Sequence, residues 1–107
     1  MSPLGEQTRL AFQALDGVTE VSIHGELDLG AEAELIERLT DLAALGNPLV
    51  IDMAAVSFLD STGTRVLLLA QRACEDAGTR ITLRAVPPAI RRTLEVAELD
   101  TILRIAD

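Results

Sequence analysis

The centre of the chain holds a short apolar run followed by a long helix pattern, and this pair constrains the fold most. Residues 49–53, with the sequence Leu-Val-Ile-Asp-Met, are too apolar for an exposed segment and predict an interior strand covered on both faces. The helix predicted over residues 61–77 has an apolar stripe, and Gly78 stands at the usual position past its end. The stripe consists of Val66, Leu67, Ala70, Ala73, Cys74 and Ala77. An interior strand that leads into such a helix restricts the chain to folds in which helices pack on a sheet.

The N-terminal half predicts a hairpin and a first helix. Residues 8–14 and 18–24 have strand character, and the Asp16-Gly17 pair between them is a strong turn signal for a β-hairpin. Residues 31–45 repeat apolar side chains at three- and four-residue steps, which predicts an amphipathic helix that ends at Gly46-Asn47-Pro48. The apolar positions of that helix are Leu35, Ile36, Leu39 and Leu42.

The C-terminal third predicts a strand, a helix and one ambiguous segment. Residues 81–84 have a strand pattern, and Pro87-Pro88 starts a helix because proline is well accommodated at the first helical position. The inner face of that helix is predicted to carry Ile90, Leu94 and Ala97. Residues 101–105 fit either a last strand or a short helix, and both would bring Ile102, Leu103 and Ile105 into the core.

The order β-β-α-β-α-β-α predicts an α/β fold in which a mixed β-sheet is packed with α-helices. The hairpin is antiparallel, and the later strands are expected to be joined through helices by right-handed crossovers. The length of 107 residues fits one domain, predicted over residues 1–107 with its core at about 8–105.

Composition excludes several classes of partner. The chain has 17 acidic and 9 basic residues and a formal charge of −8, which repels nucleic-acid phosphates and anionic membranes. It contains no Trp or Tyr, so aromatic stacking on bases is restricted to its two Phe residues. Residues 1–9 lack the pattern of a signal peptide, and no segment is long and apolar enough for a membrane span. We therefore expect no direct nucleic-acid binding, no membrane insertion and a cytoplasmic location.

The residues that enzymes use most are scarce. His24 is the only histidine and Cys74 the only cysteine, so the chain has no second His or Cys with which to build a metal site. Cys74 fits a core position on the apolar stripe of its helix, which argues against a catalytic Cys/His pair. Ser61 lacks the G-x-S-x-G context of a nucleophile elbow, and no glycine-rich phosphate loop is present. The sequence predicts no catalytic residue, no metal and no cofactor.

Two hydroxyl residues stand at the start of the central helix. The segment 58–63, Phe-Leu-Asp-Ser-Thr-Gly, places Ser61 and Thr62 where free backbone N–H groups and the positive end of the helix dipole can accommodate a phosphate. Asp60 or Ser61 also fits a plain N-cap, which would need no further function. The strand pattern at 18–24 is followed by Gly25-Glu26-Leu27-Asp28, and Asp28 is expected near Ser61 if the loops after the second and third strands share one edge.

Three motifs in register resemble the STAS domain of bacterial anti-sigma factor antagonists. They are Gly25-Glu26-Leu27-Asp28, the segment 50–63 that ends in Asp-Ser-Thr-Gly, and the segment 86–95 that begins Val-Pro-Pro. The likeness covers roughly residues 8–105, and the Asp-Ser-Thr-Gly motif is its most specific part.

The resemblance implies partner switching. In this family the unphosphorylated antagonist binds an anti-sigma factor that is also a serine kinase, which frees the sigma factor, and phosphorylation by that kinase reverses the binding. The phosphoacceptor of the family falls on Ser61, with Thr62 as the second candidate, and Asp28 and Asp60 match its acidic positions. The partner surface implied is Asp28, Asp60, Ser61, Thr62, Gly63 and Arg65. A phosphatase is the other expected partner, and we expect a monomer when free.

One position departs from the family pattern. The family commonly has Leu-Gly after the motif, whereas this chain has Thr64-Arg65. Arg65 could pair with Asp60, with a phosphate or with a carboxylate of the partner, or could be an exposed helix residue without a function. The STAS fold also resembles accessory subunits that brace the ATPase of bacterial lipid-transport ABC systems, and this is the alternative function.

Overall fold

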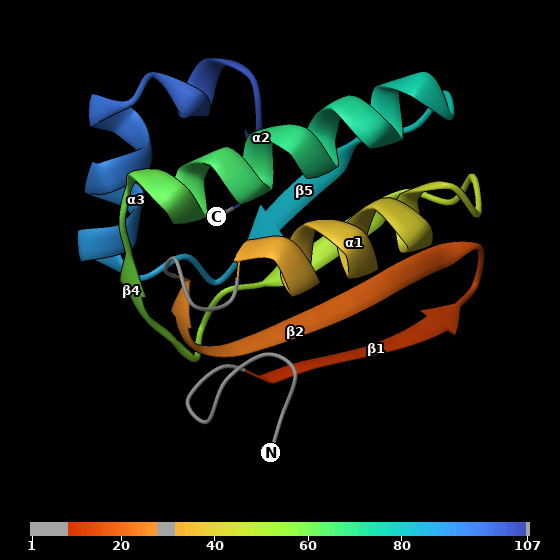
Figure 1. Cartoon of the computed structure of the whole chain (residues 1–107), viewed down its shortest axis with the longest axis horizontal. Helices are drawn as coiled ribbons and strands as arrows, with labels where there is room; N and C mark the ends of the chain where they lie inside the picture. Colours follow the sequence, from red (N-terminus) through yellow and green to blue (C-terminus); the bar gives the residue numbers. More distant parts are fainter. Residues whose placement is uncertain (1–8, 28–31, 107) are drawn as a thin grey trace.

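A β-hairpin opens the part of the chain that the computed structural model describes, residues 9–27 and 32–106 (Figure 1). Its strands are β1 (Arg9–Leu15) and β2 (Val18–Leu27), and Leu15 lies opposite Val18. Asp16 and Gly17 both have positive φ angles, 54° and 78°, as the two central residues of a type I′ turn require. The predicted hairpin is confirmed, and β2 is longer than expected.

The other elements alternate along the chain. They are α1 (Glu32–Ala43), β3 (Leu49–Asp52), β4 (Val56–Leu59), α2 (Ser61–Asp76), β5 (Ile81–Arg84), α3 (Pro88–Val96), the 3-10 helix η1 (Leu99–Thr101) and β6 (Arg104–Ile105). The ambiguous C-terminal segment therefore forms both a short helix and a short strand. Gly78 follows α2 with a φ of 79°, a conformation that glycine adopts without strain.

The strands form a mixed sheet in the order β1-β2-β3-β5-β6, and β3 lies at its centre as predicted. The predicted cover on both faces of this strand is wrong, because Leu49 and Ile51 are buried whereas Val50 and Asp52, on the other face, are only half-buried. The hairpin is antiparallel, whereas β3, β5 and β6 pair in parallel with their neighbours. The short strand β4 was not predicted. It pairs in parallel with the last residues of β2, beyond a register shift between Gly25 and Glu26. Only its first and last residues are buried, so the two-residue alternation that indicates a strand is missing from its sequence.

Helices α1 and α2 run side by side over one face of the sheet, and α3 lies at the end where α2 begins (Figure 1). Between helices and sheet lies an aliphatic core, which includes Leu35, Leu39, Ile51, Leu67, Leu83 and Leu94. Two predicted core residues are exposed. Ala97 ends α3 on the surface, and Ile102 is 43% exposed because the turn after η1 directs its neighbour Leu103 inward instead.

Candidate functional site

Asp60 is the N-cap of α2. Its backbone is extended, with φ −108° and ψ −169°, and its Oδ1 accepts a hydrogen bond from the N–H of Gly63 at 3.0 Å. One of the free donors at the helix start is thereby satisfied by a half-buried carboxylate. The capping interpretation is confirmed for Asp60, which leaves the hydroxyl of the next residue without a capping task.

Ser61 is exposed at the first position of α2. Its backbone carbonyl accepts a hydrogen bond from Thr64 Oγ1 at 2.8 Å, but its own hydroxyl bonds to no residue that the structure describes. Thr62 is half-buried and Gly63 is buried against the core. Of the two hydroxyl candidates, Ser61 is the more accessible, and a group added to its Oγ would point into solvent and not into the core.

The ends of β2 and β4 lie next to one another, because Leu27 pairs with Leu59. Since β2 and β3 are parallel neighbours, their carboxyl ends face the same edge of the sheet, as expected, and the unpredicted strand β4 lies beside the end of β2. Asp60 directly follows β4. Asp28 lies outside the described residues, so its expected approach to Ser61 stays a prediction.

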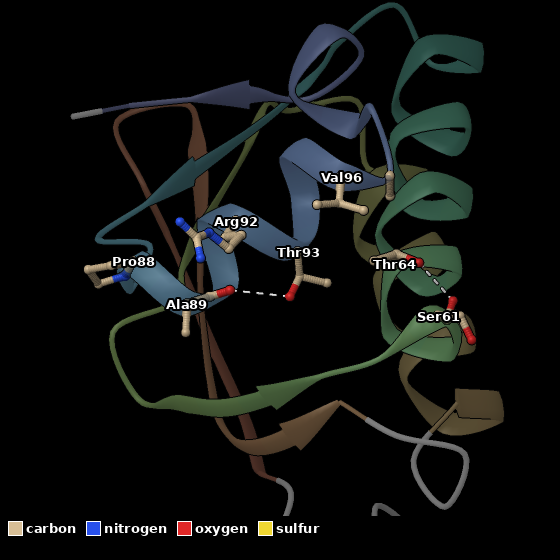
Figure 2. Close-up of a pocket in the computed structure, with 8 residues that line it drawn as sticks. Ser61, Thr64, Pro88, Ala89, Arg92, Thr93 and Val96 are labelled. Atoms are coloured by element: carbon tan, nitrogen blue, oxygen red, sulfur yellow. Dashed lines mark hydrogen bonds between the residues drawn. The ribbon is translucent and has the colours of Figure 1, made fainter.

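A groove separates the first turn of α2 from α3 (Figure 2). Its cavity measures about 630 Å³, with Ser61 and Thr64 on one wall and α3 on the other. The α3 residues and the cap that follows are Pro88, Ala89, Arg92, Thr93, Val96 and Ala97. Val96 is 80% exposed, which is unusual for a branched apolar side chain at the edge of a concave surface. The sequence analysis missed this groove, although the apolar residues on the outer side of α3 were a signal for it.

Arg65 forms an ion pair with a residue that the sequence did not indicate. Its Nη1 lies 2.5 Å from Oε1 of Glu32, the first residue of α1. The Arg65 side chain is 65% exposed and that of Glu32 is 18% exposed. Asp60, which was the intramolecular partner considered for Arg65, uses its carboxylate to cap α2 instead.

A second polar cluster lies on the sheet, on β1, β2, β3 and β5. Arg84 pairs with Glu20 at 3.3 Å and with Asp52 at 3.5 Å. A hydrogen bond from Gln13 and the contact with Arg84 lower the pKa of the Glu20 carboxyl. None of these residues lines the groove beside Ser61, so the cluster is separate from the candidate site.

The described residues offer neither a reactive thiol nor a cluster of metal ligands. Burial raises the pKa of the Cys74 thiol, which keeps it in its unreactive protonated form at neutral pH. Within residues 9–27 and 32–106, no three His, Cys, Asp or Glu side chains are grouped so that they could hold a metal ion. Across the same residues, none of the helices is long and apolar enough to cross a membrane.

The family model that matches residues 10–104 is described as "Mlab, STAS domain". The anti-sigma-F factor antagonist RsfB of Mycobacterium tuberculosis is 35% identical over 94 residues, which cover 84% of this chain and 74% of the relative. The anti-sigma-B factor antagonist of Bacillus subtilis is 30% identical over 87 residues, 81% of this chain and 80% of the relative. The crystal structure of an anti-sigma factor antagonist from Mycobacterium paratuberculosis superposes with a TM-score of 0.82 at 29% identity, over 92% of this chain and 84% of that one.

Proposed function

Because the chain belongs to the STAS domain family, we propose that it acts as an anti-sigma factor antagonist controlled by phosphorylation of Ser61. In its unphosphorylated form it binds an anti-sigma factor that is also a serine kinase, and this binding frees a sigma factor. The observation that supports the site is the exposed Ser61 hydroxyl, which Asp60 leaves free by capping α2, on a residue that lines an apolar groove.

The covalent step is phosphoryl transfer from ATP. The γ-phosphoryl group of Mg-ATP is transferred to Ser61 Oγ, the hydroxyl proton is lost, and ADP leaves. A phosphatase reverses the step by hydrolysis, with water as the second substrate and inorganic phosphate as the product. In this proposal the chain is the substrate of both reactions and supplies no catalytic residue, metal or cofactor.

The groove explains why a phosphate would abolish binding. A partner segment that fills it would bury the apolar side chain of Val96 and the first turn of α2 together. Phosphorylation adds about −1.5 to −2 charges at Ser61. Removing such a group from water without a cation on the partner costs several kcal/mol, and each 1.4 kcal/mol is about a tenfold loss in affinity. We expect the affinity for the partner to fall by about 100-fold or more without any change in fold.

The remaining features of the proposal follow from the family. Asp28, Asp60, Thr62 and Gly63 contribute to the partner surface around Ser61. Arg65, where the chain departs from the family pattern, belongs to this surface by its position four residues after Ser61 on α2. Residues 1–107 function as a single STAS domain that is a monomer when free and works in the cytoplasm.

A second candidate function is the accessory subunit that braces the ATPase of a bacterial lipid-transport system. The open apolar groove favours it, because an ATPase could fill the same surface permanently with no modification of Ser61. This candidate predicts a stable complex with an ATPase and no phosphate turnover.

Intact-mass spectrometry after incubation with each candidate anti-sigma kinase of the same organism and Mg-ATP tests the proposal. We expect one phosphoryl mass shift that is lost in Ser61→Ala and kept in Thr62→Ala. Ser57→Ala is the matched control, because Ser57 is an exposed hydroxyl four residues earlier, on β4. No shift with any kinase, together with stable co-purification with a transporter ATPase, would replace the proposal with the second candidate.

A further inference from the structure

Arg65 occupies the helix position from which a side chain can reach Ser61. The two residues are four apart on α2, so they lie on the same face of the helix about one turn from each other. Side chains on a helix point toward its N-terminus, which directs the Arg65 side chain back over the first turn. A guanidinium group one helical turn from a phosphate is suited to bidentate pairing with it.

The ion pair between Arg65 and Glu32 is weak enough for another anion to replace Glu32. The pair with Glu32 joins α1 to α2 at the surface, and the Arg65 side chain is 65% exposed. Water and salt screen the Arg65 end of the pair and weaken it, although the Glu32 side chain is only 18% exposed. A phosphate on Ser61 would compete with the Glu32 carboxylate for the Arg65 guanidinium group. It carries nearly two negative charges and three acceptor oxygens, and it is attached one helical turn from Arg65.

We propose that Arg65 is the intramolecular partner of a phosphate on Ser61, and that phosphorylation transfers its guanidinium group from Glu32 to that phosphate. The inference rests on the proposed function and concerns a residue where this chain departs from the family pattern. The transfer leaves the Glu32 carboxylate without its cation. Phosphorylation therefore changes the charge on α1 as well as on α2, and a partner that contacts either helix senses it.

The other charged groups around Ser61 do not take this role. Asp60 and Glu32 are acidic, and Asp28 lies outside the described residues. Arg92 is the cation on the α3 wall of the groove, but its side chain points away from Ser61 (Figure 2). Arg65 is thus the cation one helical turn from Ser61, whereas Arg72 lies about three turns away on the same helix and Arg92 lies on the other wall.

The test uses protein with phosphoserine incorporated genetically at position 61, so that it does not depend on a kinase. The probe is the phosphorus NMR signal of that residue, followed through its second ionisation, which for free phosphoserine occurs near pH 6. We expect the second pKa to be about 0.3 higher in Arg65→Gln than in the otherwise unchanged protein, as one helix ion pair predicts. Arg72→Gln is the matched control, because Arg72 is exposed on the same helix eleven residues from Ser61. It should leave the pKa unchanged, and Arg92→Gln should as well.

Transfer of the guanidinium group is tested separately by thermal unfolding. Without the phosphate, Glu32→Gln should lower Tm more in the protein that retains Arg65 than in Arg65→Gln. The ion pair is lost only in the former, whereas the favourable position of the Glu32 carboxylate in the first turn of α1 is lost in both. With phosphoserine at position 61 this difference should vanish. A phosphate pKa that Arg65→Gln leaves unchanged would overturn the inference. So would an effect of Glu32→Gln on Tm that, in the phosphorylated protein, is still larger with Arg65 than with Arg65→Gln. Failure of the proposed function is distinguishable from both, since it appears as the absence of any kinase-dependent mass shift.

Discussion

Replacing Asp60 and Ser61 one at a time should distinguish their contributions, since Asp60 is expected to stabilise the fold and Ser61 to accept the proposed phosphate. The two residues are adjacent, yet the structure gives them different tasks. Asp60 holds the N–H of Gly63 at 3.0 Å and is half-buried, whereas the Ser61 hydroxyl is exposed and bonds to no described residue. Asp60→Ala removes a helix cap, and Ser61→Ala removes only an exposed hydroxyl.

The magnitudes follow from these contacts. Loss of an N-cap side chain lowers the free energy of unfolding by about 1 kcal/mol, within a range of about 0.5–2 kcal/mol. Asp60→Asn keeps an acceptor that caps well and loses only the charge at the positive end of the helix, which is worth about 0.3–1 kcal/mol. Ser61→Ala should change the free energy of unfolding by less than about 0.5 kcal/mol, as for surface substitutions without a specific partner.

Urea unfolding of the four proteins measures these differences, and a 1 kcal/mol loss corresponds to a midpoint about 0.3–1 M lower. The phosphorylation assay is then run on the same samples. We expect Asp60→Ala to be the least stable protein and Ser61→Ala to be close to the unsubstituted one while accepting no phosphate. Equal stability of Asp60→Ala and the unsubstituted protein would refute the capping argument. A loss above about 1 kcal/mol in Ser61→Ala would show that the hydroxyl is part of the fold.

Two further predictions concern polar groups inside the domain. Gln71→Leu should lower the free energy of unfolding, measured by urea titration, by about 1–3 kcal/mol. The buried Gln71 Oε1 accepts a hydrogen bond from the N–H of Ile81 at 2.9 Å, and this donor would lose its partner. The control Arg72→Leu, at an exposed neighbouring position, should lower the free energy of unfolding by less than about 0.5 kcal/mol. Cys74 should make stability fall at alkaline pH: burial raises the pKa of its thiol above the ordinary value of 9.0, so above that pH the unfolded chain releases a proton that the folded protein retains. Between the ordinary and the raised pKa, the free energy of unfolding of the unsubstituted protein should decrease by up to about 1.4 kcal/mol per pH unit relative to that of Cys74→Ala. Parallel plots of the free energy of unfolding against pH for the two proteins would contradict this prediction.

The parts of the fold that the sequence predicted correctly are those with a local cause. The Asp16-Gly17 turn demands positive φ at two residues, and the leucine spacing of α1 gives one apolar helix face wherever the helix lies. The strand β4 has no such local signal. Val56 and Leu59 are buried and the two residues between them are exposed, so the strand exists because the end of β2 offers it a pairing edge. A partner distant in sequence decides this element, and periodicity cannot detect it.

In the candidate site, too, some features have a local cause in the sequence and others depend on residues far apart in it. The cap at Asp60 and the free hydroxyl at Ser61 depend only on the consecutive residues 60–63 and were predictable as alternatives. The ion pair between Arg65 and Glu32 joins side chains 33 residues apart, and the groove needs α3 to pack beside the first turn of α2. In the proposed function the Asp-Ser-Thr-Gly motif supplies the phosphate acceptor, so discrimination among partners is expected to depend on residues outside it. Val96 and Arg65 are two exposed side chains that lie beyond the motif, on α3 and α2, so exchanging them between related antagonists should transfer partner preference more effectively than exchanging the motif.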